Sequence, residues 1–302
     1  MSGASRVGGV EHVAGVVQRL AVLTGAGIPA ASAWRHAAAS SGVPAIADEL
    51  ESAQDLPARL AAVAGSAPPE ERSAWSVVAA IWSVATETGA ALAPTLHRTA
   101  DVLRDLAQSA REVDTALAGP VATSRIVLAL PLVGLLLGVI LGFDVAAVFV
   151  TVPGIACLVS GGGLIALGVR WNRGLIRWAR TQDATPGIAL DLTATALSGG
   201  TSIDRAARSV AASGALAGLD LRSQEVDEVL GFASAAGVPA VALLRAEADE
   251  QRRRARADAA SRAARLESRL LLPLGVCILP AFVLLGVVPT GIAILSSTAL
   301  PV

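Results

Sequence analysis

Three long segments without a charged residue dominate this sequence and limit what it can fold into. They run over residues 126–143, 145–169 and 270–295. A helix needs about 20 mostly apolar residues to cross the roughly 30 Å hydrocarbon core of a bilayer. Only 16% of the chain is charged and 53% is hydrophobic, whereas a soluble domain has about a quarter charged residues. We therefore expect an all-α membrane protein with a transmembrane hairpin at 126–169 and a single transmembrane helix at 270–295.

Prolines occur in all three apolar segments, and Pro280 and Pro289 belong to the third. A proline inside a soluble helix removes one backbone hydrogen bond and breaks or kinks the helix. Inside a membrane bundle, neighbouring groups satisfy the freed carbonyls, so the helix can continue. We expect the spans to continue through their prolines. Pro120, just before the first span, is expected to end the helix that precedes it.

The distribution of arginine predicts the orientation in the membrane. Nine arginines precede the first span, fifteen lie between the second and third spans, and none lies at the hairpin tip around Asp144 or in the tail 296–302. Arginine near span ends marks the cytoplasmic side. Both polar regions, 11–118 and 186–269, are therefore expected in the cytoplasm together with the N-terminus. The hairpin tip and the C-terminus are expected on the extracytoplasmic side of a multi-pass protein.

A basic, tryptophan-bearing stretch, "RWNRGLIRWAR", follows the second span. Trp171 and Trp178 are seven residues apart, and arginines surround them. Indole rings favour the headgroup level of a bilayer, and arginines favour anionic lipid. We expect an interfacial helix over 170–185 that contacts membrane lipids. A nucleic-acid patch is the competing interpretation, and the net charge of −1 gives it no support.

The first polar region, 11–118, is predicted to be a helical bundle. It is alanine-rich and is interrupted by the turn-forming stretches "GAGIP", "SGVP", "GSAPPE" and "ETG". From Leu92 onward, apolar residues recur at steps of three and four, which places them on one helix face. This stripe consists of Leu92, Leu96, Ala100, Leu103, Ala107, Ala110, Val113 and Leu117. Charged residues, Arg98 among them, occupy the opposite face.

The second polar region, 186–269, repeats the plan of the first. Gly89 and Gly237 are each followed by a proline, a leucine-marked stripe and then many charges. Earlier in each region a glycine turn separates two helices, at Gly27 in the first and at Gly200 in the second. The later landmarks are 148 residues apart and the earlier ones 173, so the first region carries an insertion around 48–70. We therefore expect two cytoplasmic helical bundles in tandem repeat.

Two groups of charged residues are candidates for contact with a partner. Glu87 lies in the last turn before the Gly89 cap, where a negative charge is unfavourable for the helix dipole. It therefore needs a partner, either inside the bundle, for example an arginine, or at an interface. The other group follows acidic residues by three or four positions, a favourable helical spacing, and consists of Arg252, Arg253 and Arg254. This face is either solvated, a docking surface for an acidic partner, or a phospholipid contact.

The chain offers no constellation typical of an enzyme. His12, His36 and His97 do not have the spacing of metal ligands. The sequence contains neither a lysine for a phosphate-binding loop nor a Gly-x-Ser-x-Gly nucleophile turn. The three spans contain no ionisable residue, which argues against transport or intramembrane catalysis. Cys157 and Cys277 lie in apolar segments and are expected to be buried thiols. We expect no enzymatic activity, no cofactor and no metal.

Several of these stretches resemble one known family. "LAVLTGAGIPAASAWRHAA", "ETGAALAPTLHRTADVLRD" and "PLGVCILPAFVLLGVVPTGIAIL" are similar to the type II secretion system F family, and most similar to its Tad-type pilus assembly branch in actinobacteria. The resemblance covers residues 13–297. The second repeat departs from the family pattern, because Ala235 stands where the first has Glu87.

The resemblance implies an inner-membrane platform protein without enzymatic activity, which couples a cytoplasmic hexameric ATPase to pilin assembly. The implied partners are the secretion or pilus ATPase and pilin subunits. Glycines along the spans, such as Gly161, allow close helix contact with pilin helices, a second copy or a paralogous platform protein. Glu87 and the charged helix are hypothesised to face the ATPase. Two alternatives remain open: an export channel or permease, and a membrane-anchored scaffold unrelated to pili.

Overall fold

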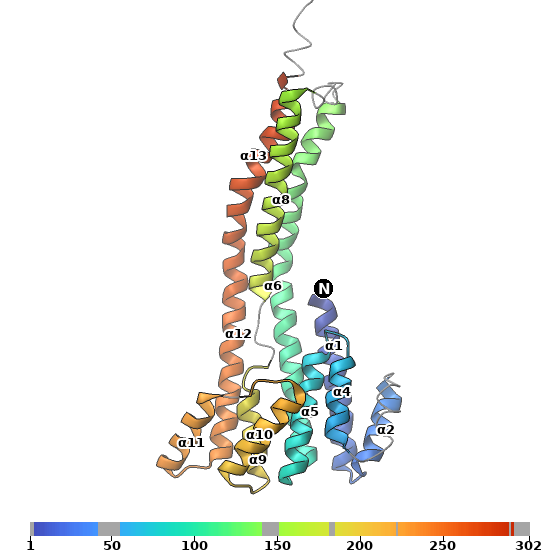
Figure 1. Cartoon of the computed structure of the whole chain (residues 1–302), viewed down its shortest axis with the longest axis vertical. Coiled ribbons are helices and arrows are strands. Elements are labelled where there is room, and N and C mark those ends of the chain that lie inside the picture. The colour runs from blue at the N-terminus through green and yellow to red at the C-terminus, as the bar shows by residue number, and fades with distance from the viewer. Residues whose placement is uncertain are drawn as a thin grey trace, which may run out of the picture. The chain divides into compact units, whose positions relative to one another are not determined.

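The chain forms helices grouped into two compact units (Figure 1). The computed structural model describes residues 3–41, 55–140, 151–180, 185–221, 223–289 and 291–292, and every regular element in these ranges is helical. Unit 1 consists of Met1–Glu112 and Gln182–Ala257, and unit 2 of Val113–Thr181 and Asp258–Val302. The expected all-helical fold is confirmed for this part of the chain.

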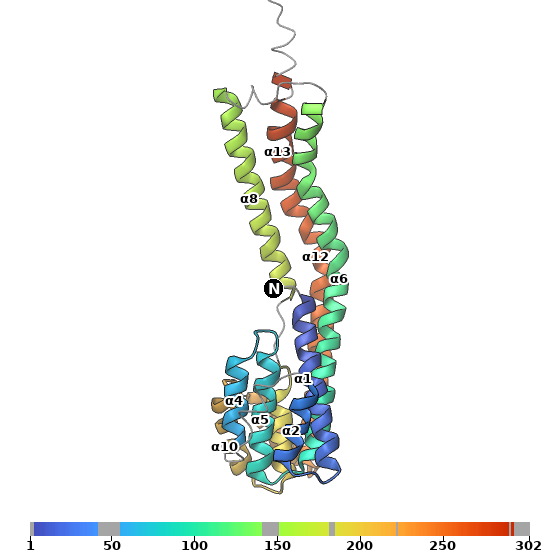
Figure 2. The same ribbon diagram turned by 90° about the vertical axis from the view of Figure 1, so that its right-hand side faces the viewer.

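Unit 1 is built around α5 (Arg72–Thr88). Twelve of the seventeen residues of α5 are buried, because the helix is apolar on nearly all sides and must be covered on nearly all sides. It packs against α4 (Leu56–Ser66), α9 (Ile188–Ser198) and α10 (Ile203–Ala217); Figures 1 and 2 show α4 beside α5. The remaining helices of the unit are α1 (Gly3–Gly25), α2 (Ala30–Ser41), α11 (Gln224–Ala236) and the first parts of α6 (Leu92–Ile140) and α12 (Ala240–Pro273).

Both polar regions of the sequence contribute to one hydrophobic core in unit 1. The buried cluster includes Leu20, Leu60 and Trp82 from the first region, and Leu192 and Val210 from the second. The two regions therefore pack against each other through this cluster. The division into separate bundles at 11–118 and 186–269 stays a prediction. Below, the first half of unit 1 means its residues up to 112, and the second half means residues 182–257.

The two halves of unit 1 contain matching turns at the predicted spacings. Helix α5 ends on Gly89 (φ 74°), whose N–H donates to Ala85, and α11 ends on Gly237 (φ 68°), whose N–H donates to Ala233. The helices that follow, α6 and α12, each begin three residues later. Positive φ is cheap only for glycine, so the predicted glycine C-caps are confirmed.

The earlier glycine turns match in the same way. Gly27 (φ 83°) donates its N–H to Thr24 at 3.1 Å, and Gly200 (φ 80°) donates to Leu197 at 3.0 Å. The next helices, α2 and α10, begin at corresponding positions. The halves then differ, because residues 42–71, which include α4, join α2 to α5, whereas residues 218–223 join α10 to α11. Helix α4 thus lies within the insertion that the sequence predicts.

The two halves lie in close contact at Gly199. A Cβ atom placed there would lie 2.3 Å from the carbonyl oxygen of Thr88 and 3.1 Å from the nitrogen of Ala90. Real Cβ atoms do not come this close to a backbone, so only glycine fits without a shift. The end of α9 can therefore rest directly on the end of α5.

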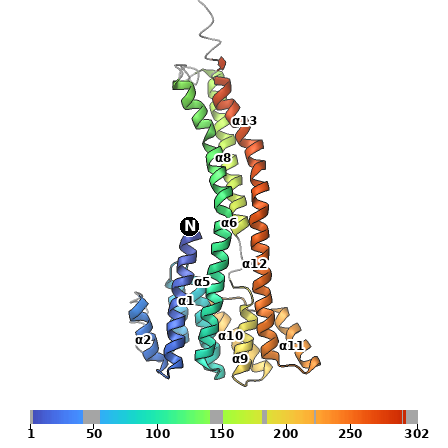
Figure 3. The same ribbon diagram turned by 180° about the vertical axis from the view of Figure 1, so that it is seen from behind.

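Unit 2 combines α8 (Val152–Arg180) with the later parts of α6 and α12 and with three short segments, η1 (Leu274–Ile278), α13 (Leu279–Phe282) and η2 (Val283–Val287). Helix α13 packs against α8 (Figure 3). A second cluster joins α6 to α12 and the end of α8, and its members are Val113, Leu117, Ala259, Ala263, Leu266 and Leu270, with Leu175 and Ile176 at its border.

Two helices in the described ranges are long and apolar enough to cross a membrane, Val152–Trp178 and Ala240–Val287. They include residues 152–169 of the second predicted span, 145–169, and most of the third. Of the first predicted span, 126–143, residues 126–140 belong to the helix α6. Residues 141–143 and Asp144 at the predicted hairpin tip lie outside the described residues. The number of membrane crossings stays a prediction.

Prolines interrupt these helices less than expected. The prediction that Pro120 ends its helix is wrong, since α6 runs without a break from Leu92 to Ile140. The φ angle of proline suits a helix, and the cost is one lost hydrogen bond next to many retained ones. Before Pro280 and Pro289 the helix widens into the π-helical segments η1 and η2, in which N–H groups bond five residues back, as Leu279 does to Leu274. The helix therefore continues through Pro280, as predicted.

The tryptophan-bearing stretch is the end of α8, not a separate helix. Trp171 and Trp178 are 40% and 38% exposed, and the Arg269 guanidinium lies 4.4 Å from the ring centroid of Trp178, a cation–π contact. Lipid contact by 170–185 stays a prediction. At Gly161, a Cβ would lie 2.5 Å from Cγ of Leu285, so this glycine allows a close helix contact within the chain; contact of the span glycines with another chain stays a prediction.

Candidate functional site

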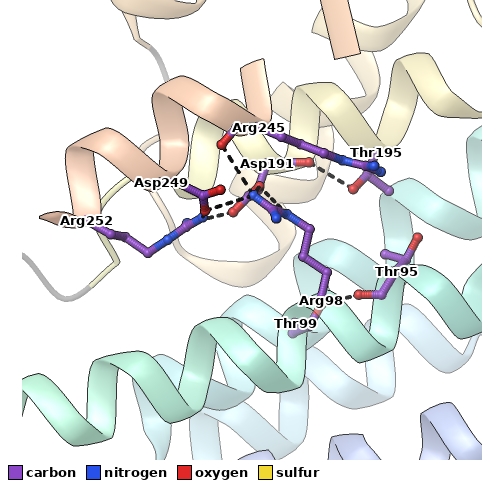
Figure 4. Close-up of polar contacts among 8 residues, drawn as sticks. All are labelled: Thr95, Arg98, Thr99, Asp191, Thr195, Arg245, Asp249 and Arg252. Carbon is purple, nitrogen blue, oxygen red and sulfur yellow. Dashed lines mark hydrogen bonds and ion pairs between the residues drawn. The ribbon is translucent and has the colours of Figure 1, made fainter. Parts of the chain in front are cut away.

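The most concentrated polar site in unit 1 surrounds Asp191 (Figure 4). Asp191 lies on α9, among apolar neighbours, and its side chain is only 7% exposed. Arg98 of α6 donates from Nε to Oδ1 of Asp191 at 2.8 Å, and Arg252 of α12 donates from Nη1 to Oδ2 at 2.7 Å. Each carboxylate oxygen therefore receives a guanidinium, the pairing that a buried charge requires.

A second carboxylate, Asp249, completes the network. Its Oδ1 accepts from Nη2 of Arg98 at 3.2 Å and also pairs with Arg252. Arg98 Nη2 donates in addition to the backbone carbonyl of Arg245 at 3.4 Å. The two arginines and two aspartates of the network carry equal and opposite charge, so its net charge is zero. The network joins α6 of the first half to α9 and α12 of the second half.

The hydroxyl groups near the network are occupied by their own helices. Thr95, Thr99 and Thr195 each donate at 2.8 Å to the carbonyl four residues earlier. No group of three or more His, Cys, Asp or Glu side chains is arranged for a metal ion in the described ranges. Because the acids and guanidinium groups satisfy one another, the arrangement suits holding helices together rather than proton transfer.

The surroundings shift the pKa values of two network members. Burial disfavours the charged form of Asp249, but hydrogen bonds and positive charge from Arg252 and Arg98 outweigh it, so the pKa of Asp249 lies below its ordinary value. Burial also works against the charged form of Arg252, but the Asp191 charge and hydrogen bonds to both aspartates raise the pKa of Arg252 above its ordinary value. Both shifts keep the network ionised.

Acid is expected to weaken unit 1 through Asp249. A carboxyl with a lowered folded-state pKa stabilises the fold above its unfolded value of about 3.9 and loses this contribution as pH falls through the lower folded value. The stability difference between wild type and Asp249→Asn should be constant above about pH 5 and shrink below about pH 4. Denaturant unfolding of both proteins at a series of pH values across this range measures the difference in their free energies of unfolding. Asp204→Asn, at an exposed site on α10, is the control, and a difference independent of pH would contradict the expectation.

The first half contains a weaker version of the same arrangement. At the offsets of 173 and 148 residues, Gln18, Asp101 and Arg104 correspond to Asp191, Asp249 and Arg252. Arg104 Nη1 donates to Gln18 at 3.2 Å and pairs with Asp101 at 3.2 Å. This set is exposed, with Arg104 at 50% and Asp101 at 72%. The second half thus carries a carboxylate where the first has an amide.

Glu87 has a partner inside the fold, which agrees with the first of its two interpretations and not with a contact at an interface. Its Oε2 accepts a hydrogen bond from Oγ of Ser209 on α10 at 2.7 Å. Ser209 is 1% exposed. The partner is a hydroxyl group of the second half rather than an arginine of the same bundle, so Glu87 also links the two halves of unit 1.

The three predicted arginines are divided between two roles. Arg252 is 9% exposed and belongs to the buried network. Arg253 and Arg254 are each 66% exposed and pair with Glu250 at 2.8 Å and 3.0 Å, as the helical spacing predicts. Of the three predicted arginines, only Arg253 and Arg254 therefore present charge at the surface of α12. The network around Asp191 was not predicted from the sequence. A single carboxylate within the apolar stretch "GIALDLTATALS" could have indicated a buried charge that needs a partner.

Comparison with known proteins identifies part of the chain. Residues 16–140 match the family described as "Type II secretion system (T2SS), protein F". No curated protein and no solved structure matches the chain. The matched range contains the last part of α1 and all of α2, α4, α5 and α6. Proteins of this family are inner-membrane platform components of secretion and pilus-type machines, and the two apolar helices fit insertion into a membrane. Residues 16–140 are therefore identified as a region of the type II secretion system protein F family.

Proposed function

We propose that this chain is the non-enzymatic inner-membrane platform of a Tad-type or type IV pilus machine, in which it couples a cytoplasmic ATPase to the assembly of pilin subunits. The family match over residues 16–140 carries the proposal. The apolar helices Val152–Trp178 and Ala240–Val287 support membrane insertion of the same chain. Pilins, a second copy and a paralogous platform protein are the proposed membrane partners.

The proposed topology has three crossings, with unit 1 in the cytoplasm. Residues from both halves of unit 1 share one hydrophobic core, which supports placing both halves on the same side of the membrane. This requires an even number of crossings between residues 113 and 181. We propose Val152–Trp178, which is long and apolar enough to cross a membrane, as one of them, and the uncharged segment 126–143 as the other. The arginine bias of both halves supports the cytoplasmic side.

A reporter fusion tests this topology. A reporter that is active only in the cytoplasm, fused next to Arg205 on α10, is expected to be active. Activity of a periplasm-specific or surface-specific reporter at the same place would overturn the proposed topology, and the shared cytoplasmic unit with it.

The proposed ATPase contact uses the exposed arginines of α12. Arg253 and Arg254 project from unit 1 with most of their surface exposed, and an acidic patch on the ATPase would complement them. Arg252 is excluded from this role because it is buried among Asp191 and Asp249. Glu87 contributes to the internal junction with Ser209.

Deletion and binding experiments test the function. Deleting the gene should abolish surface pili, and the full chain in detergent should retain the cytoplasmic ATPase of the same machine. Reversing charge with Arg253→Glu and Arg254→Glu should weaken retention by about tenfold, while Arg205→Glu and Arg208→Glu, at exposed positions on α10, should leave it unchanged. Intact pili after deletion, with no retention by wild type, would reject the platform role in favour of an unrelated scaffold.

A further inference from the structure

A groove of about 690 Å³ lies in the second half of unit 1, between α9, α10 and α11. Its lining includes Thr193, Ala207, Ser223, Val226 and Leu230. The volume is in the range of sites that accept large apolar groups. Most of this lining is apolar. The helices that border it are α10, with fifteen residues, and α11, with thirteen.

The matching positions in the first half hold much larger side chains. At the offsets established by the glycine turns, Thr193, Ala207, Ser223 and Leu230 correspond to Leu20, Trp34, Trp75 and Trp82. All four of these are at most 1% exposed. The rings of Trp34 and Trp82 have centroids 5.4 Å apart, and those of Trp34 and Trp75 have centroids 6.4 Å apart.

The groove is therefore the space that an aromatic cluster fills in the first half. Three indole rings are replaced by a methyl group, a hydroxymethyl group and an isobutyl group, while α9, α10 and α11 follow one another with the same glycine turns as α1, α2 and α5. Such a space gains dispersion contacts when an aromatic side chain enters it. The chemistry of the missing side chains indicates what the groove would accept.

The second half also lacks the helix that covers this region in the first half. Leu60, Val63 and Ala64 of α4 are buried, and α4 packs against α5. Helix α11 corresponds to α5 but buries only Leu230 and Ala233. Phe232 on the same helix is 61% exposed. A helix from elsewhere would supply the covering that α4 gives to α5.

The charge at the groove is negative. Asp220 and Asp227 belong to its lining, and Glu225 also lies in the first turn of α11. A ligand segment with arginine or lysine beside its apolar face complements the Asp227 carboxylate.

We propose that this groove docks an amphipathic helix of a partner protein, which inserts a tryptophan or another large aromatic side chain beside Ala207 and places a basic residue near Asp227. The binding mode is a helix in a groove with an aromatic anchor. The inference does not depend on the platform role, because it rests on the comparison of the two halves of unit 1.

A designed peptide tests the groove on the full chain in detergent. The probe is a labelled alanine-rich helix of about 16 residues, long enough to be helical, with two tryptophans four residues apart and arginines on the flanking face. Fluorescence polarisation should show binding that is about tenfold tighter than that of matched peptides in which tryptophan is replaced by alanine or arginine by glutamate.

Variants that fill the groove provide the decisive comparison. Ala207→Trp restores the residue of the corresponding first-half position and should weaken peptide binding by about tenfold, as should Ser223→Trp. Ala212→Trp, at an exposed position on α10 outside the groove, should change it by less than about twofold. Asp227→Lys should weaken the arginine peptide and strengthen the glutamate peptide. Asp227→Lys keeps the test valid if a filling variant fails to fold.

Four results would overturn the proposal. The first is unchanged binding by both filling variants with unaltered thermal unfolding, and the second is equal affinity for the tryptophan and alanine peptides. The third is displacement of the labelled peptide by free indole that binds as tightly as the tryptophan peptide does, which would make the groove a small-molecule site. The fourth is a peptide-free dimer that Ala207→Trp dissolves, because a second copy would then be the occupant.

Discussion

Replacing Asp191 with alanine is expected to lower the free energy of unfolding of unit 1 by about 3–5 kcal/mol, the cost of leaving a buried charge without its partner. Arg252 is 9% exposed and would lose its contact with Oδ2 of Asp191. Arg98, which is 30% exposed, would keep only Asp249 and the carbonyl of Arg245. The loss would weaken the attachment of α9 to α6 and α12, which the network joins.

Denaturant unfolding of the full chain in detergent measures this effect. Fluorescence in a Trp171→Phe, Trp178→Phe background reports on Trp34, Trp75 and Trp82, all buried in unit 1. The matched control is Asp101→Ala, at the corresponding first-half position, where an exposed pair contributes at most about 1 kcal/mol. Equal losses for the two variants would contradict a structural role for the network. The double variant Asp191→Leu with Arg252→Met should recover most of the stability, since an apolar pair can replace a buried ion pair.

Replacing Trp82 with alanine is expected to cost about 3–5 kcal/mol, as large-to-small changes of buried aromatic residues do. Trp82 is 1% exposed on α5, the helix that both halves of unit 1 surround. Its ring lies against Trp34. Removal would leave a cavity among helices that are fixed by several other contacts and can collapse only in part.

The same unfolding assay checks this expectation, with Leu230→Ala as the matched control. Leu230 occupies the position in the second half that corresponds to Trp82 and borders the groove. Its removal would enlarge a space that already opens to solvent, so the loss should stay below about 2 kcal/mol. If Trp82→Ala cost no more than Leu230→Ala, the first-half cluster would not be the tightly filled counterpart of the groove.

Local features of the fold were predictable from the sequence. The stripe from Leu96 to Leu117 is buried as its spacing predicts, with Leu96, Ala100 and Leu103 at most 1% exposed. Gly27, Gly89 and Gly237 adopt positive φ at the expected helix ends. These features depend on neighbouring residues only, through the helical repeat and the backbone freedom of glycine. The helical end at Pro120 was wrong because contacts on both sides outweigh one lost hydrogen bond.

The polar site was only partly predictable. Arg98 was assigned to the charged face of its helix, yet it reaches Asp191, which lies 93 residues further along the chain. Arg252 looked equivalent to Arg253 and Arg254, but only the latter two are exposed. Glu87 needed a partner on grounds of the helix dipole, and the partner turned out to be Ser209. Each choice depends on which helix comes to lie alongside, and no local spacing contains that information.

The sequence by itself determined the helical class, the apolar segments, the glycine turns and the correspondence of the two regions, because periodicity, charge and backbone freedom act over a few neighbouring residues. Only the tertiary structure decided that both regions share one core, that Asp191 joins three helices, and that the second half is open where tryptophans close the first. Those outcomes depend on burial, and burial is set by segments that are far apart in the chain and meet only in the folded unit.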